Sequence, residues 1–305
     1  MTATIKAPSR LSYSSVSTYA ECSMRWLLER GHKLSSSTWW ATLAGSAIHE
    51  LTERYDRALI GVDEVDDIKA FEKILTSAET FELTLAKYEA QTAERGEEVK
   101  ASGRVLKEHG KTGGPNKKDR DWWLVEGPAM VESYITWRKL TRWEILTLWD
   151  GSPAIELQID EPVAGRKFLG FIDRIFVRPS GEVVIVDIKS GKEPSSRLQL
   201  ATYRLGVLRK YGLDITTGAY WMAGKGDIAG LVDLEQFDLD RVEHMVEMSW
   251  RGIEAGVFLP HVSNMCSGCG VRDFCPGVGG RKAGELPVIE TVEVRQPDVA
   301  QTTLS

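Results

Sequence analysis

The feature that most constrains the fold is an apolar stretch at residues 168–192, which reads FLGFIDRIFVRPSGEVVIVDIKSGK. Pro179 and Gly181 are placed as in a type I turn followed by a left-handed glycine, which predicts two antiparallel strands joined by a short loop. The apolar side chains of both strands predict burial on both faces of a sheet: Phe171, Ile172, Ile175, Val183, Val184, Ile185, Val186 and Ile188.

The register of this hairpin decides which charged side chains meet. If the loop is Pro-Ser-Gly, Arg178 pairs with Glu182, and counting back places Asp173 opposite Asp187. Lys189 is two residues beyond Asp187 and therefore points the same way. Charges at the end of an apolar hairpin are costly unless they are paired or bound to a metal. The trio is therefore either a metal-binding site or, as the simpler alternative, an ion pair between Asp187 and Lys189 at the end of a strand.

Two further groups could join this charged end. Glu156 lies on the polar side of an alternating strand predicted at 154–162, the first strand of a meander; we slightly favour a solvent-facing position over the metal site. His49 lies on a helix predicted at 44–59, one turn from Gly45, which leaves room for a close approach. A single histidine beside a glutamate is usually solvated or satisfied in the core, and the alternative is a metal ligand.

The elements after the hairpin alternate between helix and strand. A helix is predicted at 196–211, where Gln199 and Tyr203 are four residues apart and share a face. The apolar segment 218–223 follows this helix, so we expect it to lie parallel to the second strand of the hairpin. Another helix is predicted at 239–255.

Residues 62–150 read as a mainly helical insertion that is charged at its start and rich in aromatic residues at 122–145. Within it, 100–120 is basic and reads as a loop that is either simply solvated or grips a phosphate backbone. The tail at 281–305 lacks periodicity and is predicted to be disordered.

Net charge and apolar runs limit the partners. A net charge of −6 and a pI of 5.6 exclude a basic coat over the whole surface, although they allow a local basic groove. No apolar run approaches the roughly 20 residues that span a bilayer, and the N-terminus lacks a signal-peptide core. We therefore expect a cytoplasmic protein that does not enter a membrane.

The cysteines suggest a second metal centre. The sequence has four, arranged as Cys22 far upstream of a compact loop with Cys266, Cys269 and Cys275. Four thiolates suit tetrahedral zinc or a [4Fe–4S] cluster. Zinc sites commonly pair two Cys-x2-Cys knuckles and this chain has one, which favours iron–sulfur over zinc. Free buried thiols are the remaining alternative.

Together these segments resemble the RecB-like branch of the PD-(D/E)XK nuclease superfamily. The resemblance is nearest to the single-domain exonucleases with an iron–sulfur cluster that occur in CRISPR adaptation systems and in bacteriophages. Its motifs, in order over residues 11–276, are LSYSSVSTYAEC with Cys22, GSAIHE with His49, GFID with Asp173, VDIKSGK with Asp187 and Lys189, QLATY with Gln199 and Tyr203, and CSGCGVRDFC.

This resemblance implies a restriction-endonuclease-like α/β core, a mixed central sheet flanked by helices, in one domain over 1–280 closed by the cysteines. It implies that His49, Asp173 and Asp187 bind Mg²⁺ or Mn²⁺ and that Lys189 positions or helps to deprotonate the attacking water. Gln199 and Tyr203 would support the site or touch DNA. A [4Fe–4S] cluster would bind Cys22, Cys266, Cys269 and Cys275.

The function expected from these residues is a metal-dependent DNA exonuclease that degrades single-stranded ends in recombination, repair or CRISPR adaptation. A helicase, a recombinase or an integrase would be a fitting partner. The alternative is a subunit that holds DNA ends without cutting them, although the intact Asp173, Asp187 and Lys189 argue against a decayed site.

Overall fold

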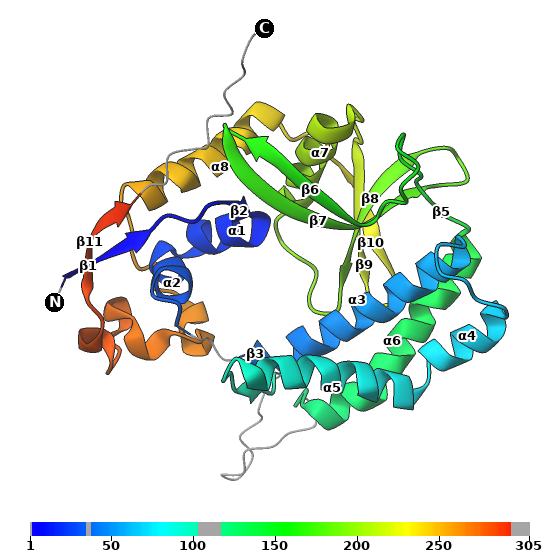
Figure 1. The fold of residues 1–305 in the computed structure, drawn as a ribbon, viewed down its shortest axis with the longest axis horizontal. Helices are drawn as coiled ribbons and strands as arrows, with labels where there is room; N and C mark the ends of the chain where they lie inside the picture. Colours follow the sequence, from blue (N-terminus) through cyan, green and yellow to red (C-terminus); the bar gives the residue numbers. More distant parts are fainter. Residues whose placement is uncertain (1, 35–37, 103–116, 294–305) are drawn as a thin grey trace, which may run out of the picture. The chain divides into compact units, whose positions relative to one another are not determined.

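The computed structural model describes residues 2–34, 38–102 and 117–293. Within them the fold is mixed α/β, as predicted. A mixed sheet, which contains the hairpin at 166–189, is flanked by helices (Figure 1). The chain divides into two compact units, the first comprising 1–36, 159–170 and 238–305 and the second 37–158 and 171–237. That residues 1–280 act as one nuclease domain stays a prediction.

The second unit is built on the predicted hairpin. Strand β7 (Arg166–Val177) enters this unit and pairs antiparallel with β8 (Val183–Lys189). Strand β9 (Thr217–Met222) lies parallel to β8, which confirms the predicted parallel pairing. Two pairings were not predicted: β10 (Asp227–Asp233) runs antiparallel to β9, and the short β5 (Glu144–Ile145) pairs with β7.

The turn of the hairpin has the predicted geometry. Gly181 has φ +87°, and its amide donates to the carbonyl of Arg178 over 2.8 Å. The amide of Arg178 donates in turn to the carbonyl of Glu182, also over 2.8 Å. At the far end of the regular ladder Arg174 lies opposite Val186. This is the predicted register, so Asp173 comes one step beyond the last regular pair.

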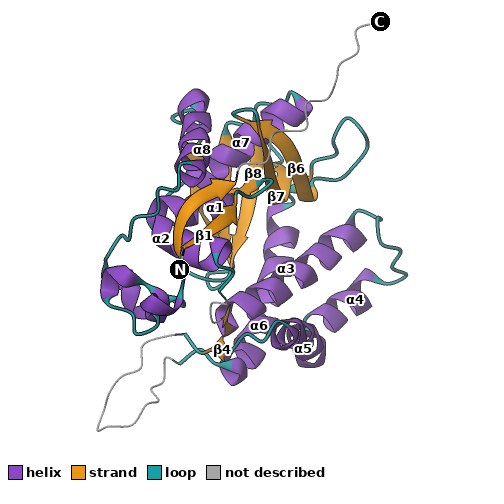
Figure 2. Cartoon of the chain, turned by 60° about the vertical axis from the view of Figure 1, so that its left-hand side comes forward, coloured by secondary structure: helices purple, strands orange, loops and turns teal. Residues whose placement is uncertain are grey.

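The core of the second unit lies between this sheet and a group of helices (Figure 2). These helices are α3 (Trp40–Leu59), α4 (Ile68–Leu75), α5 (Ala78–Glu94) and α6 (Arg120–Thr141), so the predicted insertion is mainly helical. The strands contribute alternate residues to this core, namely Phe176, Val184, Val186, Ile188, Ala219 and Trp221. The intervening residues face away from it, toward α7 (Leu198–Tyr211).

Burial at the hairpin departs from the prediction at two positions. Phe171 is 47% exposed and Val183 is half-buried, whereas Ile172 and Ile175 are fully buried. Before the first turn of α7, the Ser196 hydroxyl accepts a hydrogen bond from the amide of Leu198. A short parallel pair, β3 (Thr38–Trp39) with β4 (Val99–Lys100), completes this unit.

The first unit brings the two ends of the described chain together. Strand β1 (Thr2–Lys6) pairs in parallel with β11 (Val288–Glu293), so the prediction of disorder from residue 281 is wrong for these residues. Residues 294–305 lie outside the described chain. Helix α8 (Leu239–Glu254) confirms the helix predicted at 239–255. Strand β2 (Leu11–Ser12) pairs in parallel with the start of β7.

The helical segments of residues 13–31 are interrupted at Cys22. Helix α1 (Tyr13–Glu21) is capped by the Ser12 hydroxyl and ends before Cys22, whose backbone is extended at φ −162° and ψ 101°. Helix α2 (Ser23–Trp26) then begins and continues as a π-helical turn at Leu27–Gly31.

Strand β6 (Ile155–Val163) alternates buried and exposed residues as predicted and pairs with β7. No helix in the described ranges is long and apolar enough to cross a membrane.

Candidate active site

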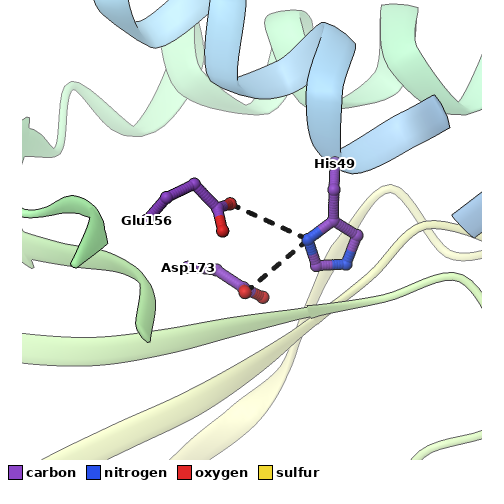
Figure 3. Close-up of side chains that lie close together, drawn as sticks. All are labelled: His49, Glu156 and Asp173. Atoms are coloured by element: carbon purple, nitrogen blue, oxygen red, sulfur yellow. Dashed lines mark ion pairs between the residues drawn. The ribbon is translucent and has the colours of Figure 1, made fainter. Parts of the chain in front are cut away.

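A group of potential metal ligands lies where α3, β6 and β7 approach one another in the second unit. His49, Glu156 and Asp173 each contribute one ligand atom, and these atoms lie within 4.8 Å of one another (Figure 3). The Nδ1 atom of His49 is 3.9 Å from Glu156 Oε1 and 3.6 Å from Asp173 Oδ1. An imidazole nitrogen and two carboxylate oxygens are a donor set that divalent cations accept.

The other ring nitrogen of His49 settles which way the imidazole faces. Nε2 lies 3.0 Å from the carbonyl oxygen of Ile188, which can only accept a hydrogen bond, so Nε2 is the donor. In the neutral ring Nδ1 then carries a lone pair directed at the two carboxylates. Three electron-rich atoms facing one another require a cation between them. The metal-free site meets this need with a proton.

The charge on His49 reflects this arrangement. Burial alone lowers the pKa of His49, but the carboxylates of Asp173 and Glu156 outweigh it and raise the pKa to about 9. Burial raises the pKa of Asp173, against the opposing effect of His49. The Asp173 carboxylate is anchored because its Oδ2 accepts a 2.6 Å hydrogen bond from the amide of Ile188.

Glu156 is part of the group, so the slight preference for a solvent-facing position was wrong. Its backbone has φ +45°, a left-handed conformation that is uncommon for residues other than glycine. Its Oε1 accepts a 3.0 Å hydrogen bond from the buried Arg174. The alternating pattern placed Glu156 on the polar side of its strand. The residue that turns it inward, Arg174, lies on β7, and nothing in the sequence indicates this contact.

Asp187 lies beside this group but makes different contacts. Its Oδ2 is 2.6 Å from Lys189 Nζ, an ion pair without the angle of a hydrogen bond. Its Oδ1 accepts a 2.7 Å hydrogen bond from Gln199 Nε2, which also donates to the Tyr203 hydroxyl over 2.7 Å. The structure thus brings Asp187 together with Lys189, Gln199 and Tyr203, and Asp173 together with His49 and Glu156.

Asp187 is a buried carboxyl in an acidic neighbourhood. Burial, and then the charge of Asp173, raise its pKa to about 7 despite the opposing effect of Lys189. Tyr203 has its pKa raised by burial and then by the charge of Asp187. The three carboxylates of the site therefore outnumber its lysine and histidine, Lys189 and His49. Such an excess of negative charge is expected of a site that binds an added cation.

These groups border a cleft of about 760 Å³ within the second unit. His49, Glu156 and Lys189 line one part of it, while Lys87 and Tyr88 from insertion helix α5 line another. The close approach expected at Gly45 is present, since an added Cβ there would lie 2.7 Å from the hydroxyl of Ser190. The basic loop proposed to grip phosphates lies mostly at 103–116, outside the described residues.

The four cysteines line one small cavity in the first unit: Cys22, Cys266, Cys269 and Cys275. The extended backbone at the helix break places Cys22 there, and its sulfur accepts a 3.4 Å hydrogen bond from the amide of His261. The sulfur of Cys266 accepts another from the amide of Ser263 over 3.3 Å. Burial raises the pKa of the Cys269 thiol. Backbone amides directed at sulfur are typical of thiolates that ligate metal.

The fold and this site define a nuclease class. The chain belongs to the PD-(D/E)XK nuclease superfamily, because the model of that superfamily matches residues 10–276. Members of this superfamily are metal-dependent nucleases, so DNA is the expected class of substrate. The three atoms that face one another at His49 Nδ1 are suitable ligands for the divalent ion that such chemistry uses.

Two phage proteins are similar to this chain. The Gene 69 protein of Mycobacterium phage L5 is 28% identical over 310 residues, an alignment covering 87% of this chain and 95% of that protein. The Gene 69 protein of Mycobacterium phage D29 is 30% identical over 177 residues, covering 51% of this chain and 65% of that protein, slightly less than two thirds. A solved structure titled "Crystal structure of SSO0001" aligns with a TM-score of 0.32 at 12% identity, covering 75% of this chain and 95% of that one, a likeness that supports no conclusion.

Replacing Asp187 by Asn should stabilise the metal-free protein at alkaline pH. The folded-state pKa of about 7 lies above the ordinary carboxyl value of about 4, so the folded state loses stability as pH rises through this interval. The Asn variant escapes that loss. We expect its melting temperature in EDTA to exceed that of the wild type by a few degrees at pH 8, with the difference shrinking toward pH 4.

Asp160→Asn, at an exposed position on β6, is the matched control and should leave the melting temperature unchanged. A melting temperature for Asp187→Asn at or below the wild-type value at pH 8 would show that Asp187 is not a destabilising buried charge.

Proposed function

We propose that this protein is a Mg²⁺- or Mn²⁺-dependent DNA exonuclease that acts on single-stranded ends. The observation that carries the proposal is the His49–Glu156–Asp173 group beside the Asp187–Lys189 pair, at the edge of one cleft. The superfamily makes nuclease chemistry the expectation, and the preference for single-stranded ends rests on the resemblance to single-domain exonucleases.

His49, Glu156 and Asp173 would hold the divalent ion. Asp187 is a further candidate ligand because its buried carboxylate lies beside this group, where the charge of Asp173 helps to raise its pKa. When bound, such an ion lowers the pKa of a coordinated water and neutralises phosphate charge. His49 can ligate only after losing the proton on Nδ1, while its Nε2–H bond to Ile188 keeps the ring oriented.

Lys189 is the residue available to the substrate. Its side chain is 27% exposed and borders the cleft, so its ammonium can donate to a phosphate oxygen or hold a water against it. As negative charge grows on the phosphate during attack, a fixed ammonium at hydrogen-bond distance stabilises it. Gln199 and Tyr203 keep the Asp187 carboxylate in place, which in turn fixes Lys189.

DNA would enter the cleft along its lysines. Lys87, Lys189 and Lys192 all line it, and Lys87 is 51% exposed although paired with Glu50. Cations spaced along a groove suit a phosphate backbone. A cytoplasmic role in recombination, repair or CRISPR adaptation, alongside a helicase, recombinase or integrase, is part of this proposal, and its phage relatives make a bacteriophage setting fitting.

The cysteine cavity would hold a [4Fe–4S] cluster. Four half-buried cysteines line one cavity, and backbone amides donate to two of the sulfurs. Cys22 comes from the N-terminal part of the first unit and the others from its C-terminal part, so a cluster would tie these parts together. Ser23 already bonds to the backbone of Leu259 in both directions, at 2.7 and 3.1 Å.

The nuclease assignment predicts that Asp187→Ala abolishes Mn²⁺-dependent loss of end-labelled single-stranded DNA. Lys189→Ala should slow it by about 100-fold or more, because one fixed electrostatic donor is removed. Lys225→Ala, whose side chain is 63% exposed and does not line this cleft, is the control and should cut normally. The assay uses labelled single- and double-stranded DNA with each metal.

Two results would reject this assignment. Wild-type cutting by Asp187→Ala would remove the catalytic role. Tight DNA binding by the wild type without turnover in either metal would instead support a subunit that only holds DNA ends.

The cofactor assignment predicts a brown protein after anaerobic purification, with about four iron atoms per chain. Cys22→Ser should lose the colour and most of the iron, whereas Ser23→Ala should keep both. A colourless protein with zinc would replace the cluster by a structural zinc site and leave the nuclease proposal standing.

A further inference from the structure

A buried ionic network lies behind the candidate metal ligands. At its centre is Asp56 of α3, whose side chain is fully buried. Its carboxylate accepts hydrogen bonds from Arg138 Nε at 2.8 Å, from Arg174 Nε at 2.6 Å and from the Tyr134 hydroxyl at 2.6 Å. Tyr134 and Arg138 belong to insertion helix α6, so the insertion reaches this network directly.

Arg174 is the member that connects the network to the site. Its side chain is fully buried, and its Nη1 donates to Glu156 Oε1 at 3.0 Å and to the backbone carbonyl of Asp173 at 2.6 Å. The same guanidinium thus contacts Asp56, one candidate metal ligand and the main chain of another. Its Nη2 has no hydrogen-bond partner among the described residues.

The charges of this network balance only if Glu156 is counted. Arg138 and Arg174 bring two positive charges into the interior, where Asp56 supplies one negative charge. Glu156 supplies the second through Arg174. Buried charges are retained when each is paired in good geometry, and the rigid fork of an arginine can hold two carboxylates in fixed positions. Glu156 also has its left-handed backbone at this point, a conformation that persists only where the surroundings hold it.

We propose that Arg174 is a positioning residue for the metal site, holding the Glu156 carboxylate and the Asp173 main chain in the geometry that a divalent ion requires. Through Asp56 it anchors that geometry to α3 and α6. The inference rests on the proposed function only in requiring that the His49–Glu156–Asp173 group binds a divalent ion.

Arg138 is a matched control for Arg174. Both guanidiniums are buried against the same Asp56 carboxylate, at 2.8 and 2.6 Å, so both support the fold in the same way. Arg138 also donates a hydrogen bond to the carbonyl of Trp143, whereas Arg174 also donates to Glu156 and to the backbone carbonyl of Asp173. A merely structural role would make the two arginines equivalent, and a positioning role would not.

The experiment is a calorimetric titration of metal-free full-length protein with Mn²⁺. Arg174→Lys keeps a cation against Asp56 but cannot span both carboxylates, so it should bind Mn²⁺ about 10- to 100-fold more weakly than the wild type. Arg138→Lys should bind within about threefold of the wild type. Circular dichroism and melting curves for both variants identify folded protein. If Arg174→Lys does not fold, Arg174→Gln takes its place, because Asp56 then stays paired with Arg138.

A second measurement separates positioning from general loosening. Glu156→Ala lowers Mn²⁺ affinity by itself and removes the acceptor that Arg174 holds. Adding Arg174→Lys to it should therefore cause a smaller further loss, which comes from the Asp173 main-chain contact alone. The full 10- to 100-fold loss persisting in the Glu156→Ala background would overturn the proposal. Equal losses of Mn²⁺ affinity in Arg174→Lys and Arg138→Lys would also overturn it. Unchanged Mn²⁺ affinity in Arg174→Lys would do the same. A wild-type protein that binds no Mn²⁺ would instead remove the proposed metal site itself.

Discussion

The structure depends on two carboxylates, Glu156 and Asp173, that face the same nitrogen of His49. Since the opposite ring nitrogen donates to the Ile188 carbonyl, the facing atoms are all electron-rich unless a proton or a metal ion lies between them. The raised pKa of His49 follows from this geometry. The raised pKa keeps a proton on His49 in the metal-free site, and a divalent ion can take the place of that proton.

The surrounding fold explains how such a group is tolerated. The β7–β8 hairpin ends in charged residues after a run of fully buried ones, so Asp173 and Asp187 stay buried while Lys189 lines the cleft. Helix α7 supplies the Gln199 amide that donates to Asp187 and the Tyr203 hydroxyl that accepts from the same amide, and α3 supplies His49. Arg138 and Tyr134 of α6 donate to Asp56, the carboxylate that also accepts from the arginine that holds Glu156. Each positioned group therefore depends on an element distant in the sequence.

Sequence reasoning succeeded where the determinants are local. Pro179 and Gly181 determine the turn, and the turn determines the register of the two strands. This register places Asp173 at the same end of the hairpin as Asp187. It failed where long-range contacts decide. The inward turn of Glu156 depends on Arg174, which lies on a different strand. The pairing of β11 with β1 uses backbone hydrogen bonds that leave little trace in side-chain periodicity.

The most direct test of this account is a crystal structure of the wild-type protein with Mn²⁺, located by its anomalous scattering. The account predicts an anomalous peak bonded to His49 Nδ1 and to carboxylate oxygens of Glu156 and Asp173. Saturating Mn²⁺ with no peak among these three side chains, or with the ion bound elsewhere in the cleft, would contradict it.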